Sequence, residues 1–149
     1  MANIYVSLAG SNTAPYDTWA KAATAIGTAL GIAVNGDTVW VRTGTYAEHI
    51  AVGAGVTVRS ETSVPTDVII DGTSSGRVVF MDSTSYLIGC TVCNGLSADP
   101  VIGGGIVGGN VRLCIVRDNV SWSGGGGCQV CNSVWNSEIY DNEVYGGVE

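Results

Sequence analysis

An internal repeat in the second half of the chain constrains the fold more than any other feature of this sequence. Three segments align with one another at nearly equal spacing: Cys90–Gly95, Cys114–Asn119 and Ser137–Asn142. A glycine run agrees with this alignment, because Gly103–Gly105 recurs as Gly125–Gly127 and Gly146–Gly147 begins a third copy. Periods of about 20 to 25 residues are typical of β-solenoids, in which each repeat forms one coil. We predict an all-β chain folded as a right-handed parallel β-helix, with a repeat of about 23 residues that is clearest from residue 87.

Short apolar segments extend this interpretation to the middle of the chain. They are separated by Gly, Ser, Thr, Pro or Asp: Ile50–Val52, Val56–Val58, Val68–Ile70 and Val78–Phe80. Most neighbours lack a hairpin dipeptide such as Asn-Gly between them, which favours parallel pairing between successive coils. We therefore expect a single β-helix domain, 1–149, with the N-terminal cap and first coil in 1–46 and stacked coils in 47–149.

A helical pattern occurs near the N-terminus. Apolar residues at spacings of four, three, four and three mark one face of an amphipathic helix: Trp19, Ala23, Ile26, Leu30 and Ala33. Asp17 or Thr18 can serve as the N-cap, and the turn residues 35–37 end the pattern. We expect an α-helix here that caps the first coil.

Stacked coils place equivalent residues in ladders about 4.8 Å apart. The repeat predicts an inward aliphatic ladder and a polar ladder at a turn: Val92, Val116 and Ile139, then Asn94, Asp118 and Asp141. Asp118 and Asp141 would lie one rung apart. Such a pair is a candidate site for an adventitious Ca²⁺ ion and a weaker candidate for catalysis, and no resident cofactor is expected.

The five cysteines are an odd number and therefore cannot all pair within one chain. Two Cys-x-x-Cys pairs, Cys90/Cys93 and Cys128/Cys131, raise the alternative of a zinc site or a redox pair. However, positions i and i+3 of a strand point to opposite faces. We therefore interpret most of the cysteines as small buried residues and predict no metal site.

Charge and composition exclude several classes of function. Six basic residues against thirteen acidic ones give a net charge of −7, which argues against nucleic acids and anionic membranes as partners. Hydrophobic residues make up 46% of the chain and charged residues 13%, so disorder is not expected. No apolar run is long enough for a membrane span, and residues 1–6 do not predict a signal peptide.

The first third of the chain resembles a known family. Ile4–Ser7, the predicted helix, and Gly36–Tyr46 followed by Glu48 are similar to the N-terminal cap of the pectate-lyase-like superfamily, in alginate-lyase and chondroitinase-B-like proteins and in uncharacterised surface β-helix proteins. The glycine run and the Cys/Asn repeat are similar to long repetitive β-helix proteins of environmental bacteria. The resemblance implies a β-helix, polysaccharides as the class of substrate, and an extracellular or cell-surface location.

The enzymes of that superfamily imply catalytic residues that this chain does not match. Their lyases use a Lys or Arg base near the middle of a longer helix, whereas the only lysine here, Lys21, lies in the predicted capping helix, and Arg112 and Arg117 are the only basic residues of the repeating half. Their hydrolases use close aspartates and a Gly-His-Gly segment, but the sole histidine, His49, follows Glu48. We predict no catalytic residues; an activity, if present, would be that of a polysaccharide lyase or glycoside hydrolase.

The sequence supports two hypotheses for function. The chain stops inside the repeat without a closing helix, so it is either a piece of a longer protein or a module whose last coil pairs with another copy, with Val134, Ile139 and Val144 as the predicted interface. The leading hypothesis is a non-catalytic structural or surface module that forms a homo-oligomer in this way. The alternative is a truncated polysaccharide-binding or lyase-like domain with a sugar platform of aromatic residues: Trp122, Trp135, Tyr140 and Tyr145.

Overall fold

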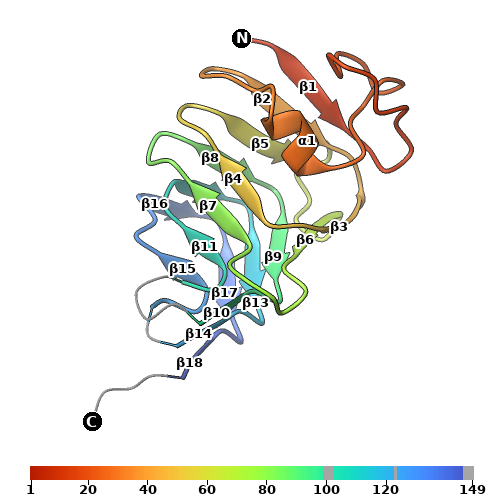
Figure 1. Ribbon diagram of the computed structural model, residues 1–149. Coiled ribbons are helices and arrows are strands. Elements are labelled where there is room, and N and C mark those ends of the chain that lie inside the picture. The colour runs from red at the N-terminus through yellow and green to blue at the C-terminus, as the bar shows by residue number, and fades with distance from the viewer. Residues whose placement is uncertain (99–102, 123, 146–149) are drawn as a thin grey trace.

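The computed structural model describes residues 1–98, 103–122 and 124–145. These residues form mostly short β-strands, and every strand pair among them is parallel (Figure 1). The all-β class is therefore confirmed, and the parallel sheets fit the predicted β-helix. The third glycine copy at Gly146–Gly147 lies outside the described residues. No helix in the described ranges is long and apolar enough to cross a membrane.

The described residues form four parallel sheets. Sheet A has the order β1 (Asn3–Val6), β2 (Thr38–Val41), β5 (Thr57–Ser60), β8 (Tyr86–Ile88), β12 (Asn110–Arg112) and β16 (Ser133–Trp135). Sheet B has the order β3 (Gly44–Ala47), β6 (Val68–Asp71), β9 (Thr91–Cys93), β13 (Ile115–Arg117) and β17 (Glu138–Tyr140). Sheet C contains β4 (Ile50–Val52), β7 (Val79–Met81), β11 (Ile106–Val107) and β15 (Cys128–Gln129). Sheet D contains β10 (Leu96–Ser97), β14 (Val120–Ser121) and β18 (Glu143–Val144).

The chain visits these sheets in a fixed order, and each pass is called a coil below. The first two coils, β2–β4 and β5–β7, run through sheets A, B and C. The third and fourth, β8–β11 and β12–β15, add sheet D between B and C. The last described pass, β16–β18, is the outer coil. Figure 1 shows these passes following one another from the N-terminal end towards the C-terminal end.

Strand pairing in the later coils follows the sequence alignment residue by residue. Val116 pairs with Val92 on one side and with Ile139 on the other, as the three aligned segments predict. Ile106 pairs with Cys128, and each of them directly follows one copy of the glycine run. The polar ladder lies at a turn as expected, because its three residues have left-handed φ angles of 56°, 54° and 51°: Asn94, Asp118 and Asp141.

Close backbone contacts explain the glycine run. A Cβ atom on Gly104 would collide with the carbonyl group of Val120, and one on Gly126 would collide with the carbonyl group of Glu143. Each glycine therefore allows its segment to lie directly against sheet D of the next coil. This requirement explains why the run recurs at the spacing of one coil.

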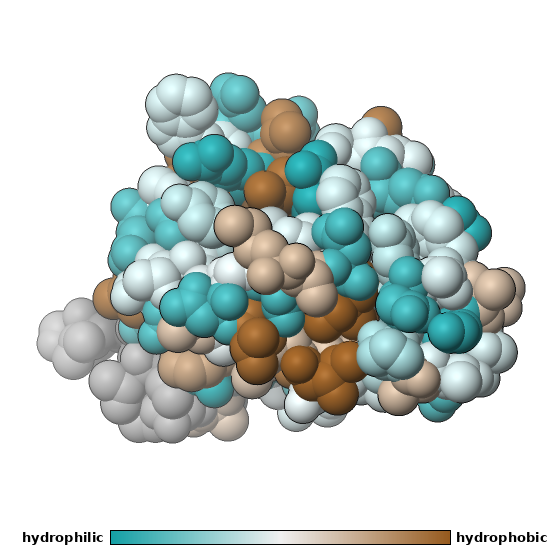
Figure 2. All heavy atoms as spheres, turned by 90° about the horizontal axis from the view of Figure 1, so that it is seen from above, coloured by the Kyte–Doolittle hydropathy of each residue, from teal (hydrophilic) through white to brown (hydrophobic). Residues whose placement is uncertain are grey.

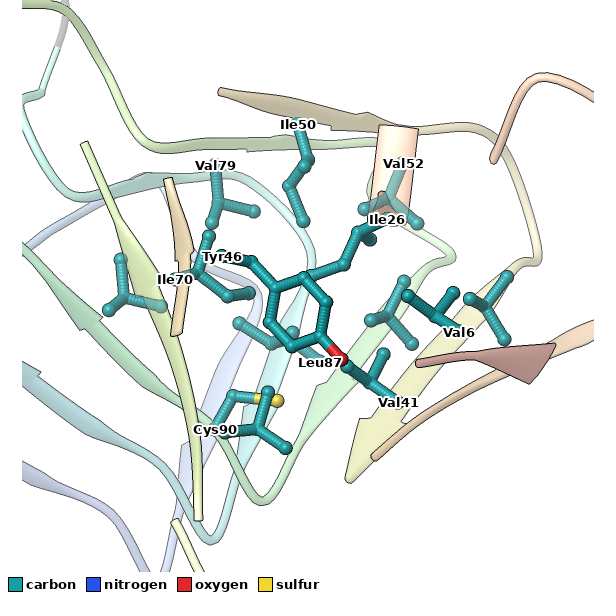
Figure 3. Packing of buried hydrophobic residues seen from close by; sticks show 14 of the residues in the cluster. Val6, Ile26, Val41, Tyr46, Ile50, Val52, Ile70, Val79, Leu87 and Cys90 are labelled. Atoms are coloured by element: carbon teal, nitrogen blue, oxygen red, sulfur yellow. The ribbon is translucent and has the colours of Figure 1, made fainter. Parts of the chain in front are cut away.

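The core lies between the sheets and is filled by alternate residues of the strands. In sheet A the fully buried inward positions include one continuous row: Val39, Val58, Leu87 and Val111. Figure 3 shows Tyr46 of β3 among side chains from several coils, including Leu87 and Cys90. Its hydroxyl group donates a hydrogen bond to the carbonyl oxygen of Arg42 at 2.9 Å. Burial of the ring raises the pKa of Tyr46 to about 12.

The helix is much shorter than predicted. Helix α1 spans only Ile26–Leu30, and the predicted helix is wrong over residues 17–25. Ala23 instead forms a parallel bridge with Val6: its N–H group donates to Tyr5 O, and its own carbonyl accepts from Ser7 N–H, both at 2.9 Å. These bonds require extended backbone at Ala23, so tertiary pairing overrides the local helical pattern. Trp19 packs against Tyr5 rather than in the core.

Loop residues and helix α1 lie beside the first strands. The outer edge of β1 is occupied by Ala23 and by Tyr16, whose carbonyl group accepts a 2.9 Å hydrogen bond from Tyr5 N–H. Helix α1 contacts β1, β2 and β4, and the Glu48 carboxylate accepts hydrogen bonds from the first two amides of this helix, each at 2.8 Å. Seen from this end, the surface is mainly hydrophilic or intermediate, with hydrophobic areas in small groups (Figure 2).

Asp37 ties the first residues to this end. Its carboxylate accepts a 2.6 Å hydrogen bond from Ala2 N–H and a 3.0 Å bond from Val34 N–H. These two backbone donors lower the pKa of the Asp37 carboxyl group. The ionised side chain therefore holds β1 beside the turn that leads into β2.

Candidate functional site

The outer coil exposes positions that are buried in the coil before it. Val134 pairs with Val111, and Ile139 pairs with Val116; the two partners are 0% exposed. Val134 itself is 39% exposed, Ile139 is 46% exposed, and Val144 of β18 is 51% exposed. The three residues of the predicted interface are thus the last described members of the inward rows of sheets A, B and D, one in each sheet. We call Val134, Ile139 and Val144 the outer apolar ladder.

Backbone groups are exposed at the same place. Strands β16, β17 and β18 stand last in sheets A, B and D, so within the described residues each of them is paired on one side only. A free strand edge presents N–H and C=O groups that can pair with another strand. The outer coil therefore combines apolar side chains with unpaired strand edges.

This coil is also acidic. Glu138, Asp141 and Glu143 are exposed, and the sequence has no lysine or arginine after Arg117. Carboxylates around the open end repel an identical end at low ionic strength, and added salt reduces that repulsion. Any assembly of two such ends should therefore depend on salt.

An asparagine ladder joins the last coils, and the sequence analysis did not single it out. The fully buried side chain of Asn119 accepts a 2.8 Å bond from Gly95 N–H and donates to the carbonyl groups of Val92 and Arg117. It also donates a 3.0 Å bond to Asn142 Oδ1. The signal in the sequence is the Asp-Asn pair that recurs in the aligned segments at 118–119 and 141–142.

Asp118 and Asp141, the predicted cation pair, occupy equivalent left-handed turns. The backbone N–H of Asp118 donates to the carbonyl oxygen of Asp141 at 3.0 Å. The Asp118 carboxylate forms an ion pair with Arg117, which neutralises one of the two charges that a cation would need. Over the described residues, no group of three or more His, Cys, Asp or Glu side chains is placed to hold a metal ion.

The four predicted platform aromatics lie on different surfaces. Trp122 and Tyr145 come together, with ring centroids 6.5 Å apart in an edge arrangement. Trp135 is on the outer face of sheet A, and Tyr140 is on the outer face of sheet B. The structure therefore has one aromatic pair, Trp122 with Tyr145, and two aromatic side chains on other surfaces.

Sheet A carries a different outward ladder, which sequence reasoning missed. Its members occupy equivalent positions in the six strands: Tyr5, Trp40, Arg59, Ile88, Arg112 and Trp135. We call this row the sheet A ladder. The spacing between its members is irregular in the first coils, because the connecting loops differ in length, so no periodic signal marks it in the sequence.

Arginine and aromatic groups stack along this face. Arg59 lies over the Trp40 ring at 4.5 Å, and Arg112 lies over the Tyr86 ring at 5.0 Å. Arg59 donates to Ser63 Oγ at 3.0 Å, while its buried Nε atom has no hydrogen-bond acceptor in the described chain. The face therefore presents cationic groups beside aromatic rings on a protein that is acidic overall.

The remaining candidates for catalysis have structural partners. His49 contacts Arg77 O at 2.8 Å through Nδ1 and Ser75 Oγ at 3.1 Å through Nε2. Lys21 lies in a turn, not in the predicted helix, and pairs with Asp17 at 3.1 Å. His49 is thus held by a carbonyl and a hydroxyl oxygen, and Lys21 forms an exposed ion pair with its near neighbour in the turn.

The two Cys-x-x-Cys segments differ in geometry. Cys90 is fully buried in the core, whereas Cys93 occupies an outward position of sheet B in register with Asp71 and Arg117. Cys128 and Cys131 both pack against the core. The expectation of opposite faces therefore fits the first pair and is wrong for the second.

No protein-family model matches the chain, and searches of curated proteins and of solved structures found no match. The interpretation of function therefore rests on the geometry described above.

Proposed function

We propose that the chain is a right-handed parallel β-helix of the pectate-lyase-like kind that serves as a non-catalytic structural or surface module and self-associates through its outer coil. The observation that carries this proposal is the outer apolar ladder beside three open strand edges. Burial of such residues against a second copy removes apolar surface from water and pairs exposed backbone groups.

The second copy is expected to bind by the same end. The N-terminal edge of β1 is already occupied by Ala23 and Tyr16, so it offers less free backbone than β16–β18. Pairing of like ends gives a closed two-fold dimer rather than a filament. Because Glu138, Asp141 and Glu143 then approach their counterparts, dimerisation should strengthen as the salt concentration rises.

Light scattering coupled to size exclusion tests this proposal. The intact chain should be a dimer, and the double variant Val134→Lys/Ile139→Lys should be a folded monomer by circular dichroism. The matched control Trp135→Lys/Tyr140→Lys changes outward residues of the same strands and should remain dimeric. A monomeric intact chain at all salt concentrations would contradict the proposal and favour further coils of a longer chain as the natural cover.

A second candidate function is the binding of an acidic polysaccharide, and the sheet A ladder favours it. Aromatic rings can stack on sugar rings, and guanidinium groups can pair with carboxylates. The rungs of a parallel sheet are about 4.8 Å apart, a distance close to one sugar unit of an extended chain. The ladder therefore offers repeated contacts to a linear anionic polymer.

Retention on immobilised alginate, pectate or chondroitin tests this second function. Arg112→Gln should weaken the retention of the chain on these polymers and should make that retention less dependent on salt concentration, because Arg112 is exposed on the sheet A ladder. Arg77→Gln removes the same charge from the Phe80 ring outside sheet A and should leave retention unchanged. Equal losses in both variants, or no retention of the intact chain, would contradict binding at sheet A.

A further inference from the structure

The backbone conformation of Val130 affects the directions in which the side chains of Cys128 and Cys131 point. Cys128 lies in β15, where it pairs with Ile106, and Cys131 follows three residues later. In regular strand the two side chains would point to opposite faces. Val130 between them has a left-handed φ of 45°, which reverses the chain locally and turns both thiols towards the core. A β-branched residue rarely adopts this conformation.

Both thiols pack against the core in a half-buried environment. Cys131 Sγ donates a weak hydrogen bond to Gln129 O at 3.8 Å. The neighbouring Cys128 side chain lowers the pKa of the Cys131 thiol, and Cys131 raises the pKa of the Cys128 thiol. By contrast, burial raises the pKa of both Cys90 and Cys114, which are almost completely enclosed. Cys131 is thus the best nucleophile of these thiols.

We propose that Cys128 and Cys131 form a dithiol site that is oxidised to an intramolecular disulfide by exchange with small-molecule disulfides. The Cys131 thiolate attacks one sulfur of the reagent, whose S–S bond breaks and releases one thiolate that takes up a proton. Cys128 then loses its proton, and its sulfur attacks Sγ of Cys131 and releases the second half of the reagent as a thiol. Two protein thiols are oxidised, and one disulfide is reduced to two thiols.

The position of the site gives this reaction a structural consequence. The pair spans the turn between β15 and β16, where the outer coil begins. A disulfide here would fix that turn without contacting the outer apolar ladder directly. The reaction does not require self-association, so its outcome is independent of the proposed dimer.

Peptide mass measurement tests the proposal with the native protein. The reduced chain is incubated with oxidised glutathione, its remaining thiols are blocked with N-ethylmaleimide in denaturant, and it is digested with trypsin. Cleavage after Arg117 leaves residues 118–149, which contain Cys128 and Cys131 and no other cysteine. We expect this peptide to lose two hydrogen atoms and to carry no maleimide, before Cys90 or Cys114 reacts.

Single variants assign the two roles. Cys128→Ser should stop with one glutathione on Cys131, because the resolving thiol is missing. Cys131→Ser should likewise form no internal disulfide and carry at most one glutathione, on Cys128. The control Cys90→Ser/Cys93→Ser removes the other Cys-x-x-Cys pair and should oxidise at 128–131 like the intact chain.

Three results would overturn the proposal. The first is a native peptide 118–149 that carries two maleimide groups while other cysteines are oxidised. The second is a peptide that carries two glutathiones and no internal disulfide. The third is formation of the disulfide at the same relative rate in urea, because the folded geometry would then contribute nothing. The measurement on the intact chain decides the question even if a variant does not fold.

Discussion

The two ends of the molecule are both built from parallel strands, but they differ in whether their outer strand edges are hydrogen-bonded. At the N-terminal end, Ala23 and Tyr16 occupy the edge of β1, and α1 contacts β4. At the outer coil, the edges of β16, β17 and β18 have no partner strand in the described residues. An irregular loop can thus occupy a sheet edge, whereas a regular repeat leaves the edge of its last described strand free to pair. We expect stability to decrease from the closed end to the open end.

The largest difference is expected for the same substitution at two positions of one ladder. Ile70, Val92, Val116 and Ile139 are in register, but Ile70 is fully buried and Ile139 is half exposed. Ile70→Ala should destabilise the fold by about 2–5 kcal/mol, and Ile139→Ala by about 1 kcal/mol or less. Urea unfolding at protein concentrations low enough to dissociate the proposed dimer measures both losses. Equal losses would show that the outer coil is as well packed as the interior.

The asparagine ladder provides the second comparison. Asn119→Ala removes a fully buried side chain and leaves Gly95 N–H and the Val92 carbonyl without their partner. We expect a loss of about 2–3 kcal/mol for this variant and about 1 kcal/mol for Asn142→Ala, whose side chain is only partly buried. Urea unfolding again gives the two values. A greater loss for Asn142→Ala would reverse the predicted order of stability.

Asp37 offers a test of the closed end through pH. Its pKa is lowered in the folded protein, so its contribution is present above the unfolded value of 3.8 and is lost as the pH falls through the folded value. Asp37→Asn should therefore be less stable than the intact chain at pH 7, and the difference should shrink below about pH 4. Thermal unfolding at a series of pH values measures the difference. A difference in stability that stays constant from neutral to acidic pH would contradict a stabilising role of the ionised Asp37 side chain.

The smallest effect is expected at a turn shared by the last coils. Gly89, Leu113 and Asn136 occupy the same turn between sheets A and B with φ angles of 70°, 51° and 47°. Leu113 is the least suited of the three to a left-handed backbone. Leu113→Asn should stabilise the fourth coil by about 0.5–1 kcal/mol, measured as a higher urea midpoint with an unchanged slope. A lower midpoint would show that the Leu113 side chain contributes more than its conformation costs.

Sequence reasoning predicted the regular half of the fold better than the irregular half. The spacing of the aligned segments reappears in the strand register, because short turns keep the later coils nearly equal in length. The helix over 17–25 was wrong because Ala23 pairs with Val6, a contact between segments that no local pattern records. The all-β class and the left-handed polar turns were predictable from composition and repeat.

The candidate sites show the same contrast between regular and irregular segments. Those that continue the repeat were predictable, and those that depend on irregular segments were not. Exposure of Val134, Ile139 and Val144 was predictable, because they continue the inward rows into the last described coil. The sheet A ladder was not predictable, since Tyr5, Trp40 and Arg59 are separated by loops of unequal length. The packing of both Cys128 and Cys131 against the core was missed because it depends on the left-handed backbone of Val130, an unusual conformation for valine.

Hydrogen–deuterium exchange at low and high protein concentration tests the central claim most directly. If the outer coil binds a second copy, amides in 133–144 should gain protection as the concentration rises, while those of β1 and β2 stay unchanged. If protection in 133–144 is independent of concentration, or if the gain falls on the N-terminal end instead, the outer coil is not the assembly surface.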